Sequence, residues 1–198
     1  MPGTPDKHLP ALLGYLRGER RTLGLAAEAR ARLAAWLETE LAAGAAPVGA
    51  PAASSTPAPG SGPQAPPGWL LVFTDGASRG NPGLAAAGVV VYAAGGELHR
   101  EGKALGVLTN NQAEYRALLL GLAAVRRLGG ERVEVAMDSE LIVRQLEGRY
   151  KVKHAQLKPL YEEARLALAG FTAWRVRHVP RAENALADAL ANEALDSL

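Results

Sequence analysis

The pattern of apolar and polar residues changes along the chain, and from residue 69 onward it is that of a folded domain. Apolar runs bounded by glycine predict strands, while apolar residues recurring every three or four positions predict helices. By these criteria we expect strands at residues 69–75, 85–94, 97–105, 132–138 and 171–179. We expect helices at residues 109–130, 139–148, 157–170 and 183–195.

The order of these elements indicates an α/β fold. Three strands come first, and the Gly95-Gly96 pair predicts a tight turn between the second and the third. The later strands are separated by helices, and such crossovers join parallel strands. We therefore expect a mixed five-stranded sheet flanked by helices, in which an antiparallel meander is extended by parallel strands.

Residues 45–68 differ from the sequence on either side. They carry no charged side chain and 7 of the 13 prolines. Such a tract cannot bury enough apolar surface to offset the entropy lost on ordering. We interpret it as a linker between a helical N-terminal segment, residues 1–44, and a domain at residues 69–198. The N-terminal segment fits either a plain helical hairpin or an element that binds nucleic acid or a protein partner.

Composition narrows the chemistry and the compartment. The 198 residues include no cysteine, so a metal ion would have to be held by oxygen or imidazole ligands. The formal net charge of +2 neither requires nor excludes nucleic acid. No apolar run reaches the length of a transmembrane helix, roughly 18 residues, and the first apolar run is too short for a signal peptide. We expect a cytoplasmic protein without membrane contact.

Four acidic residues stand out by position. Asp75 and Asp138 each end an apolar strand. Glu114 lies in the first turns of a predicted helix, and Asp188 is embedded in the apolar stretch ALADALA. Each has a plain explanation alone, as a turn former, a helix-start acid or a solvated side chain. Converging at one sheet edge, the four would repel one another unless divalent cations neutralised them. Oxygen ligands suit Mg²⁺ or Mn²⁺, and two such ions about 4 Å apart support phosphodiester displacement.

The glycine-rich stretch after Asp75 raises the alternative of a nucleotide cofactor. Gly76, Gly80 and Gly83 are not followed by the Lys-Ser/Thr pair of a phosphate-binding loop. A dinucleotide-binding loop would open a helix, whereas the next predicted element is a strand. We therefore expect no small-molecule cofactor. A hairpin turn remains, either alone or with backbone and Asn81 contacts to a sugar-phosphate chain.

Four stretches resemble, in order and spacing, the motifs of type 1 ribonuclease H: TDGASRGNPG, TNNQAEYRALLLGL, MDSELIVRQLEG and VPRAENALADALANEA. The resemblance spans residues 69–195. It implies a ribonuclease H-like fold and an endonuclease that cuts the RNA strand of RNA–DNA hybrids. The implied products carry 5′-phosphate and 3′-hydroxyl ends.

The resemblance also implies roles for the acids. It makes Asp75, Glu114, Asp138 and Asp188 the ligands of two divalent ions, Mg²⁺ or Mn²⁺. Asp75 would bridge both ions, and Asp188 would join it at the ion that activates water. The other two acids would hold the ion at the leaving 3′-oxygen.

Substrate contacts are implied in the same way. Gly80 and Asn81 match a loop that touches the RNA backbone. Asn110 and Asn111 match residues near the 2′-hydroxyl groups, which distinguish RNA from DNA. Thr109 and Asn111 match a pocket for a DNA phosphate. Capping is the alternative for Thr109, because Thr109 and Gln112 have capping-box spacing.

Two departures from the family pattern bear on substrate binding and catalysis. The long basic insertion of many members is replaced by the compact segment GRYKVKHAQLKPL, in which Lys151 and Lys153 are candidate phosphate contacts. An ordinary solvated face would explain that segment equally well. For the family's mobile histidine, His178 and Arg181 compete, and we favour Arg181 for product release or charge stabilisation.

Two alternatives to a hybrid-specific nuclease stay open at this point. One is a non-catalytic module that binds hybrids, although the presence of all four acids argues against it. The other is a nuclease of broader duplex RNA specificity.

Overall fold

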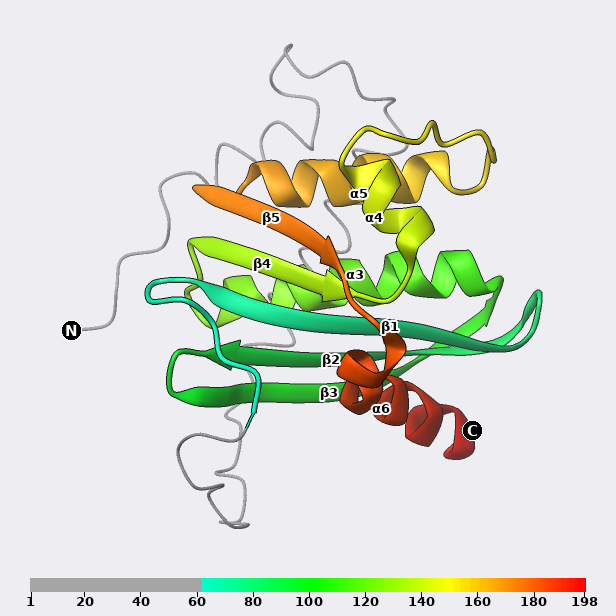
Figure 1. The fold of residues 1–198 in the computed structure, drawn as a ribbon. Coiled ribbons are helices and arrows are strands. Elements are labelled where there is room, and N and C mark those ends of the chain that lie inside the picture. Colours follow the sequence, from blue (N-terminus) through cyan, green and yellow to red (C-terminus); the bar gives the residue numbers. More distant parts are fainter. Residues whose placement is uncertain (1–61) are drawn as a thin grey trace. The chain divides into compact units, whose positions relative to one another are not determined.

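The computed structural model of the protein describes residues 62–198 (Figure 1). The helices predicted in residues 1–44 and most of the predicted linker lie outside the described residues. Their separation into domains therefore stays a prediction. No helix within residues 62–198 is long and apolar enough to cross a membrane.

A five-stranded mixed sheet forms the centre of the described region, in the order β3-β2-β1-β4-β5. β1 pairs antiparallel with β2 and parallel with β4, while β2–β3 is antiparallel and β4–β5 parallel. This confirms the predicted meander extended by parallel strands. The strands are β1 (Leu70–Gly80), β2 (Gly83–Ala93), β3 (Gly96–Leu108), β4 (Arg132–Met137) and β5 (Ala173–His178).

Strand β1 is longer than the sequence predicts. It continues through the glycine-rich stretch as far as Gly80, which pairs with Gly83. The prediction that Asp75 ends its strand was therefore wrong, because Asp75 lies inside β1 opposite Gly88. Glycines that suggest a turn are accommodated here in an antiparallel ladder, and the turn itself is confined to Asn81 and Pro82.

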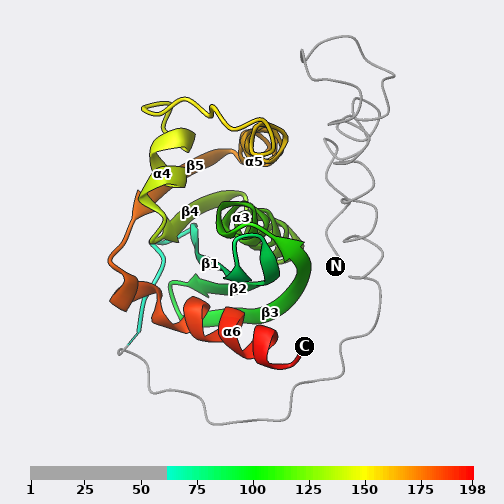
Figure 2. The ribbon, with the colours of Figure 1, turned by 90° about the vertical axis from the view of Figure 1, so that its right-hand side faces the viewer.

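Helices cover both faces of the sheet, as Figure 2 shows. α3, α4 and α5 lie on one side, and α6 lies on the other, across β1, β2 and β3. The sequence predicts all four helices, with starts that differ by one or two residues. A 3-10 turn precedes α6. The bounds are α3 (Asn110–Arg127), α4 (Glu140–Leu146), α5 (Lys158–Ala169), η1 (Arg181–Asn184) and α6 (Ala185–Asp196).

The end of the predicted linker packs on the domain. The Ala65 backbone N–H donates to the carbonyl oxygen of Ala93 at 3.3 Å. Ala65 is buried in a cluster with Leu71, Phe73 and Tyr92 on the face of the sheet that α6 also covers. The folded region therefore begins a few residues before the first predicted strand.

Gly88 allows α6 to approach the sheet closely. A Cβ atom at this position would lie 1.9 Å from the carbonyl oxygen of Ala187, a backbone atom that cannot turn aside. Ala187 precedes Asp188, so the contact at Gly88 fixes the height of that acid above the sheet.

We predict that Gly88→Ala displaces α6. The free energy of unfolding in urea should fall by at least about 2 kcal/mol, within the range of overpacked cores. Gly95→Ala is the matched control, since nothing lies within 4 Å of a Cβ atom there. Its effect should stay within about 0.5 kcal/mol. Equal stability of the two variants would contradict the packing argument.

Candidate active site

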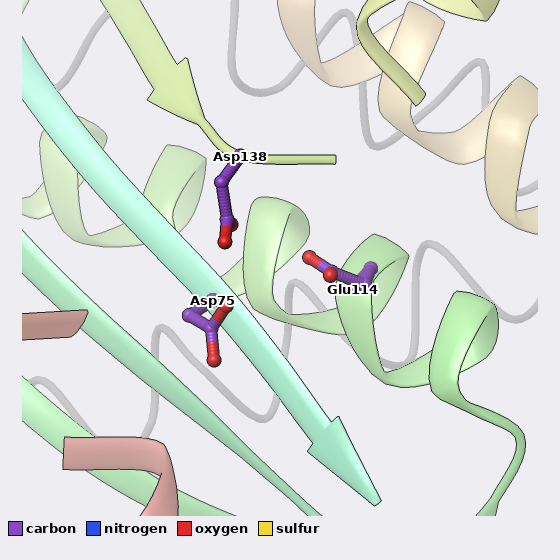
Figure 3. A group of neighbouring side chains, drawn as sticks. All are labelled: Asp75, Glu114 and Asp138. Carbon is purple, nitrogen blue, oxygen red and sulfur yellow. The ribbon is translucent and has the colours of Figure 1, made fainter. Parts of the chain in front are cut away.

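Three acidic side chains converge beside β1. Asp75 comes from the strand itself, Glu114 from the first turns of α3, and Asp138 directly follows β4. Each offers a carboxylate oxygen, and these oxygens all lie within 4.8 Å of one another. In Figure 3, Asp138 and Glu114 reach toward Asp75 from the end of β4 and from α3. The structure thus brings together three of the four acids singled out in the sequence.

The parallel pairing of β1 with β4 places two of these acids side by side. The last paired residues are Phe73 and Ala136. Asp75, inside β1, and Asp138, just after β4, each lie two residues further along the chain. The parallel pairing therefore stops at the carboxyl end of β4, and α/β sheets commonly bind ligands at such strand ends.

Glu114 joins them because Gly76 lets α3 come close. A Cβ atom on Gly76 would lie 2.2 Å from the backbone of Ala113 and Glu114. The Gly76 backbone N–H donates a hydrogen bond to the Glu114 carboxylate. A residue with a side chain at position 76 would push the helix, and the acid it carries, away from Asp75.

The cluster is electrostatically costly in the absence of a cation. Burial, followed by the charges of Asp138 and Asp188, raises the pKa of Asp75 to about 7. Burial, followed by the charges of Asp75 and Asp138, raises the pKa of Glu114 to about 9. A hydrogen bond between Asp75 and Asp138 adds to the shift of Asp75.

This arrangement fits a divalent cation. Among the described residues, Glu114 Oε2 is a buried oxygen without a hydrogen-bond partner. Unpaired buried carboxylate oxygens are costly, and a hard cation satisfies several of them at once. The residues present therefore suit a metal bound through oxygen.

Asp188 is set slightly apart from the other three acids. It is partly buried in the first turn of α6 and forms an ion pair with Arg181. Asn192 Nδ2 donates to its Oδ2 at 3.1 Å. Its negative charge nevertheless raises the pKa of Asp75, so it lies at the margin of the same site.

The two candidates for the mobile basic residue differ in their surroundings. Arg181 is exposed in η1, and its positive charge lowers the pKa of both Asp75 and Glu114. His178 ends β5 opposite Met137 in the sheet, and its side chain is exposed. Only Arg181 therefore has a recorded electrostatic link to the acids.

The predicted substrate residues fall into two places. Asn81 Oδ1 accepts a hydrogen bond from the Asn110 backbone N–H at 3.0 Å, which joins the β1–β2 turn to the start of α3. Thr109 and Gln112 form the capping box expected from their spacing. This group also includes Asn111, in the first turn of α3, and Gly80, which has a φ of +104° and precedes Asn81.

The basic segment forms the second place. Lys151 and Lys153 are exposed in the connection between α4 and α5. The Arg144 guanidinium lies 5.3 Å from the ring centre of Tyr150, which is itself exposed.

Sequence reasoning missed Asn184. This residue is buried, and its Nδ2 donates to Asp138 Oδ1 at 2.9 Å and to the Thr74 carbonyl oxygen at 3.1 Å. The available signal was its place four residues before Asp188, at the junction of a loop and an apolar helix.

Comparison with known proteins gives a consistent family assignment. Residues 73–194 match a family described as reverse transcriptase-like. Ribonuclease HI of Halobacterium salinarum is 47% identical over 130 residues, which make up 65% of this chain and 65% of that protein. The crystal structure of RNase H1 from Halobacterium salinarum NRC-1 matches with a TM-score of 0.65 and 45% identity, over 66% of this chain and 99% of that one. This chain belongs to the ribonuclease HI family.

Other members of the ribonuclease HI family extend the comparison. Bifunctional protein Rv2228c of Mycobacterium tuberculosis is 45% identical over 65% of this chain and 36% of that protein. LC11-RNase H1, solved in complex with an RNA/DNA hybrid, matches with a TM-score of 0.61 and 41% identity, over 65% of this chain and 97% of that one. This chain thus spans about two thirds or less of the curated relatives named here.

The structure accords with a ribonuclease HI chain that has no long basic insertion. α4 ends at Leu146 and α5 begins at Lys158, and the connection between them contains no further helix.

We predict that the metal-free protein loses stability as pH rises. The folded-state pKa values of Asp75 and Glu114 lie above the ordinary values of 3.8 and 4.5 for these carboxyl groups. Between the unfolded and folded pKa values the folded state holds more protons, so stability falls with pH and levels off above each folded pKa. The melting temperature in EDTA should therefore fall from about pH 5 to about pH 9.

Substitution of the acids checks the cause. Asp75→Asn and Glu114→Gln should each flatten this pH dependence, and above about pH 8 each should melt higher than the parent in EDTA. Asp196→Asn, an exposed acid paired with Arg79, is the control and should leave the profile unchanged. The same profile in the parent and in all three variants would show that these acids do not cause the pH dependence of stability.

Proposed function

We propose that this protein is a metal-dependent endonuclease that hydrolyses the RNA strand of RNA–DNA hybrids. The observation that carries the proposal is the convergence of Asp75, Glu114 and Asp138 within 4.8 Å. Like charges this close repel unless protons or a cation offset them, and the buried Glu114 Oε2 without a hydrogen-bond partner among the described residues favours a cation. Hydrolysis would leave 5′-phosphate and 3′-hydroxyl ends.

The four acids Asp75, Glu114, Asp138 and Asp188 would hold two divalent cations, Mg²⁺ or Mn²⁺. When bound, such ions lower the pKa of water and stabilise the charge of an in-line phosphodiester displacement. The chain itself supplies rigidity. Burial and the hydrogen bond from Gly76 keep the Glu114 carboxylate in place before any substrate arrives.

Arg181 is the basic residue best placed to assist. Its exposed guanidinium is paired with Asp188, so it could swing toward a scissile phosphate and back. An arginine stays protonated at neutral pH and cannot shuttle protons. We therefore assign it charge stabilisation or product release, and we keep His178 as the weaker alternative.

The substrate contacts extend from the acids along α3. Gly80 and Asn81 would meet the RNA backbone, and Asn110 and Asn111 the 2′-hydroxyl groups. Thr109 with Asn111 would hold a phosphate of the DNA strand. Lys151 and Lys153 would add contacts to phosphates further along the duplex, where sequence does not matter.

The relatives support a hybrid as the substrate. LC11-RNase H1, 41% identical, is solved in complex with an RNA/DNA hybrid. We extend that substrate to this chain, and with it a cytoplasmic role in removing RNA from hybrids formed during replication or transcription. Residues 1–44 would form a separate helical segment, joined by the linker 45–68, that binds nucleic acid or a protein partner.

The test is cleavage of an end-labelled RNA–DNA hybrid beside RNA–RNA and DNA–DNA duplexes, with Mg²⁺, Mn²⁺ or EDTA. We expect cutting of the RNA strand of the hybrid, abolished by EDTA. Cutting of RNA–RNA at a similar rate would replace the proposal with a broader nuclease. Binding of the hybrid without cutting in either metal would replace it with a binding module.

We predict that Asp75→Asn and Asp138→Asn each lower the cleavage rate by at least about a hundredfold, because each removes a carboxylate from the metal site. Circular dichroism should show both variants folded. Asp196→Asn is the matched acid-to-amide control and should retain the parent rate. Full activity in either cluster variant would refute the assignment of the acids.

A second prediction separates Arg181 from His178. Arg181→Ala should lower kcat on the order of tenfold to a hundredfold, since it removes a positive charge from the site. His178→Ala should change kcat by less than about twofold, because its exposed side chain has no recorded link to the acids. The reverse ranking in single-turnover and steady-state rates would transfer the role to His178.

A further inference from the structure

Asn184 occupies a helix N-cap but does not cap the helix. It is the residue before α6, a position where asparagine normally accepts a hydrogen bond from the first turn. Its side chain makes no such bond here. The helix therefore forgoes a stabilising contact, which implies that the amide is used elsewhere.

The amide points instead at β1 and at the residue that follows β4. Asn184 Nδ2 donates to the carbonyl oxygen of Thr74, the neighbour of Asp75 in β1. It also donates to Asp138 Oδ1, just after β4. Both partners can only accept, so the orientation of the amide is fixed by chemistry. One buried side chain thus connects three parts of the site. It joins β1 beside Asp75 and the Asp138 carboxylate to the start of α6, whose first turn bears Asp188.

This bridge engages Oδ1 of the Asp138 carboxylate. Without the donor, the Asp138 carboxylate could rotate. The cost to the protein is visible at the other end of the amide. Asn184 Oδ1 is buried and has no hydrogen-bond partner among the described residues. A buried polar atom left unpaired indicates that the donor end, not the fold alone, decides the residue type at this position.

We propose that Asn184 is a positioning residue for the metal site, acting through Asp138. It holds one oxygen of Asp138 so that the other faces the cations. It also fixes the position of α6, which bears Asp188, relative to Thr74 and Asp138. This inference rests on the proposed function, because it concerns the affinity of the same acids for a divalent cation.

The experiment measures Mn²⁺ binding by the full-length protein, using the electron paramagnetic resonance signal of free Mn²⁺. Asn184→Ala should weaken Mn²⁺ binding by about tenfold or more, as found for residues that orient metal ligands. Asn184→Leu keeps the number and branching of the side-chain heavy atoms, so it removes the donor without leaving a cavity, and it should weaken binding equally. If only one of these two variants folds, that variant alone provides the test.

Leu190→Ala is the matched control for a general effect on α6. Leu190 is a partly buried residue of α6 that packs on the core cluster. Its substitution should lower stability yet leave the Mn²⁺ affinity within about twofold of the parent. In hybrid cleavage, Asn184→Ala should raise the Mn²⁺ concentration for half-maximal rate about tenfold and leave KM for the hybrid unchanged.

The outcomes distinguish failure of this inference from failure of the proposed function. Mn²⁺ affinity of the Asn184 variants equal to that of the parent would overturn the role of Asn184 and leave the proposed function standing. Equal weakening by Leu190→Ala would overturn it as well, because the effect would then follow from loss of helix packing. Failure of the parent protein itself to bind Mn²⁺ or cut the hybrid would overturn the proposed function, and this inference with it.

Discussion

Mutual repulsion among three closely spaced carboxylates, two of them buried, is the constraint around which this domain is arranged. Asp75, Glu114 and Asp138 would separate if their supports allowed it, since the energy of like charges falls with distance. The supports do not allow it. β1 and β4 are neighbouring parallel strands in the middle of the sheet, and α3 packs on β1. The rigidity of the sheet therefore holds the acids together until a positive charge offsets their repulsion.

Two close contacts between backbones bring helices against that sheet. Gly76 meets α3 on one face, and Gly88, opposite Asp75 in the next strand, meets α6 on the other. Each helix contributes an acid near its first turns, Glu114 from α3 and Asp188 from α6. Because Gly76 and Gly88 have no side chains, α3 and α6 pack close to the sheet. Their acids, Glu114 and Asp188, therefore lie near Asp75.

Much of this arrangement could be predicted from the sequence, because strong periodicity and motif spacing specify elements and their order. The limits are equally physical. Gly76 and Gly80 suggest a turn, yet they extend β1 because antiparallel pairing with β2 continues past Asp75. Ala65 belongs to a tract that looks like linker, but tertiary packing buries it. Asn184 looks like a helix cap, and nothing local shows that its amide turns to Asp138 instead.

The raised pKa values of Asp75 and Glu114 have a further consequence for how a cation is taken up. Near neutral pH the metal-free site retains protons that a free carboxyl would have lost. A divalent ion entering the site must expel them, so loading is an exchange of protons for metal. The heat measured on binding then includes the ionisation heat of the buffer that accepts those protons. Calorimetry in two buffers would count the protons released.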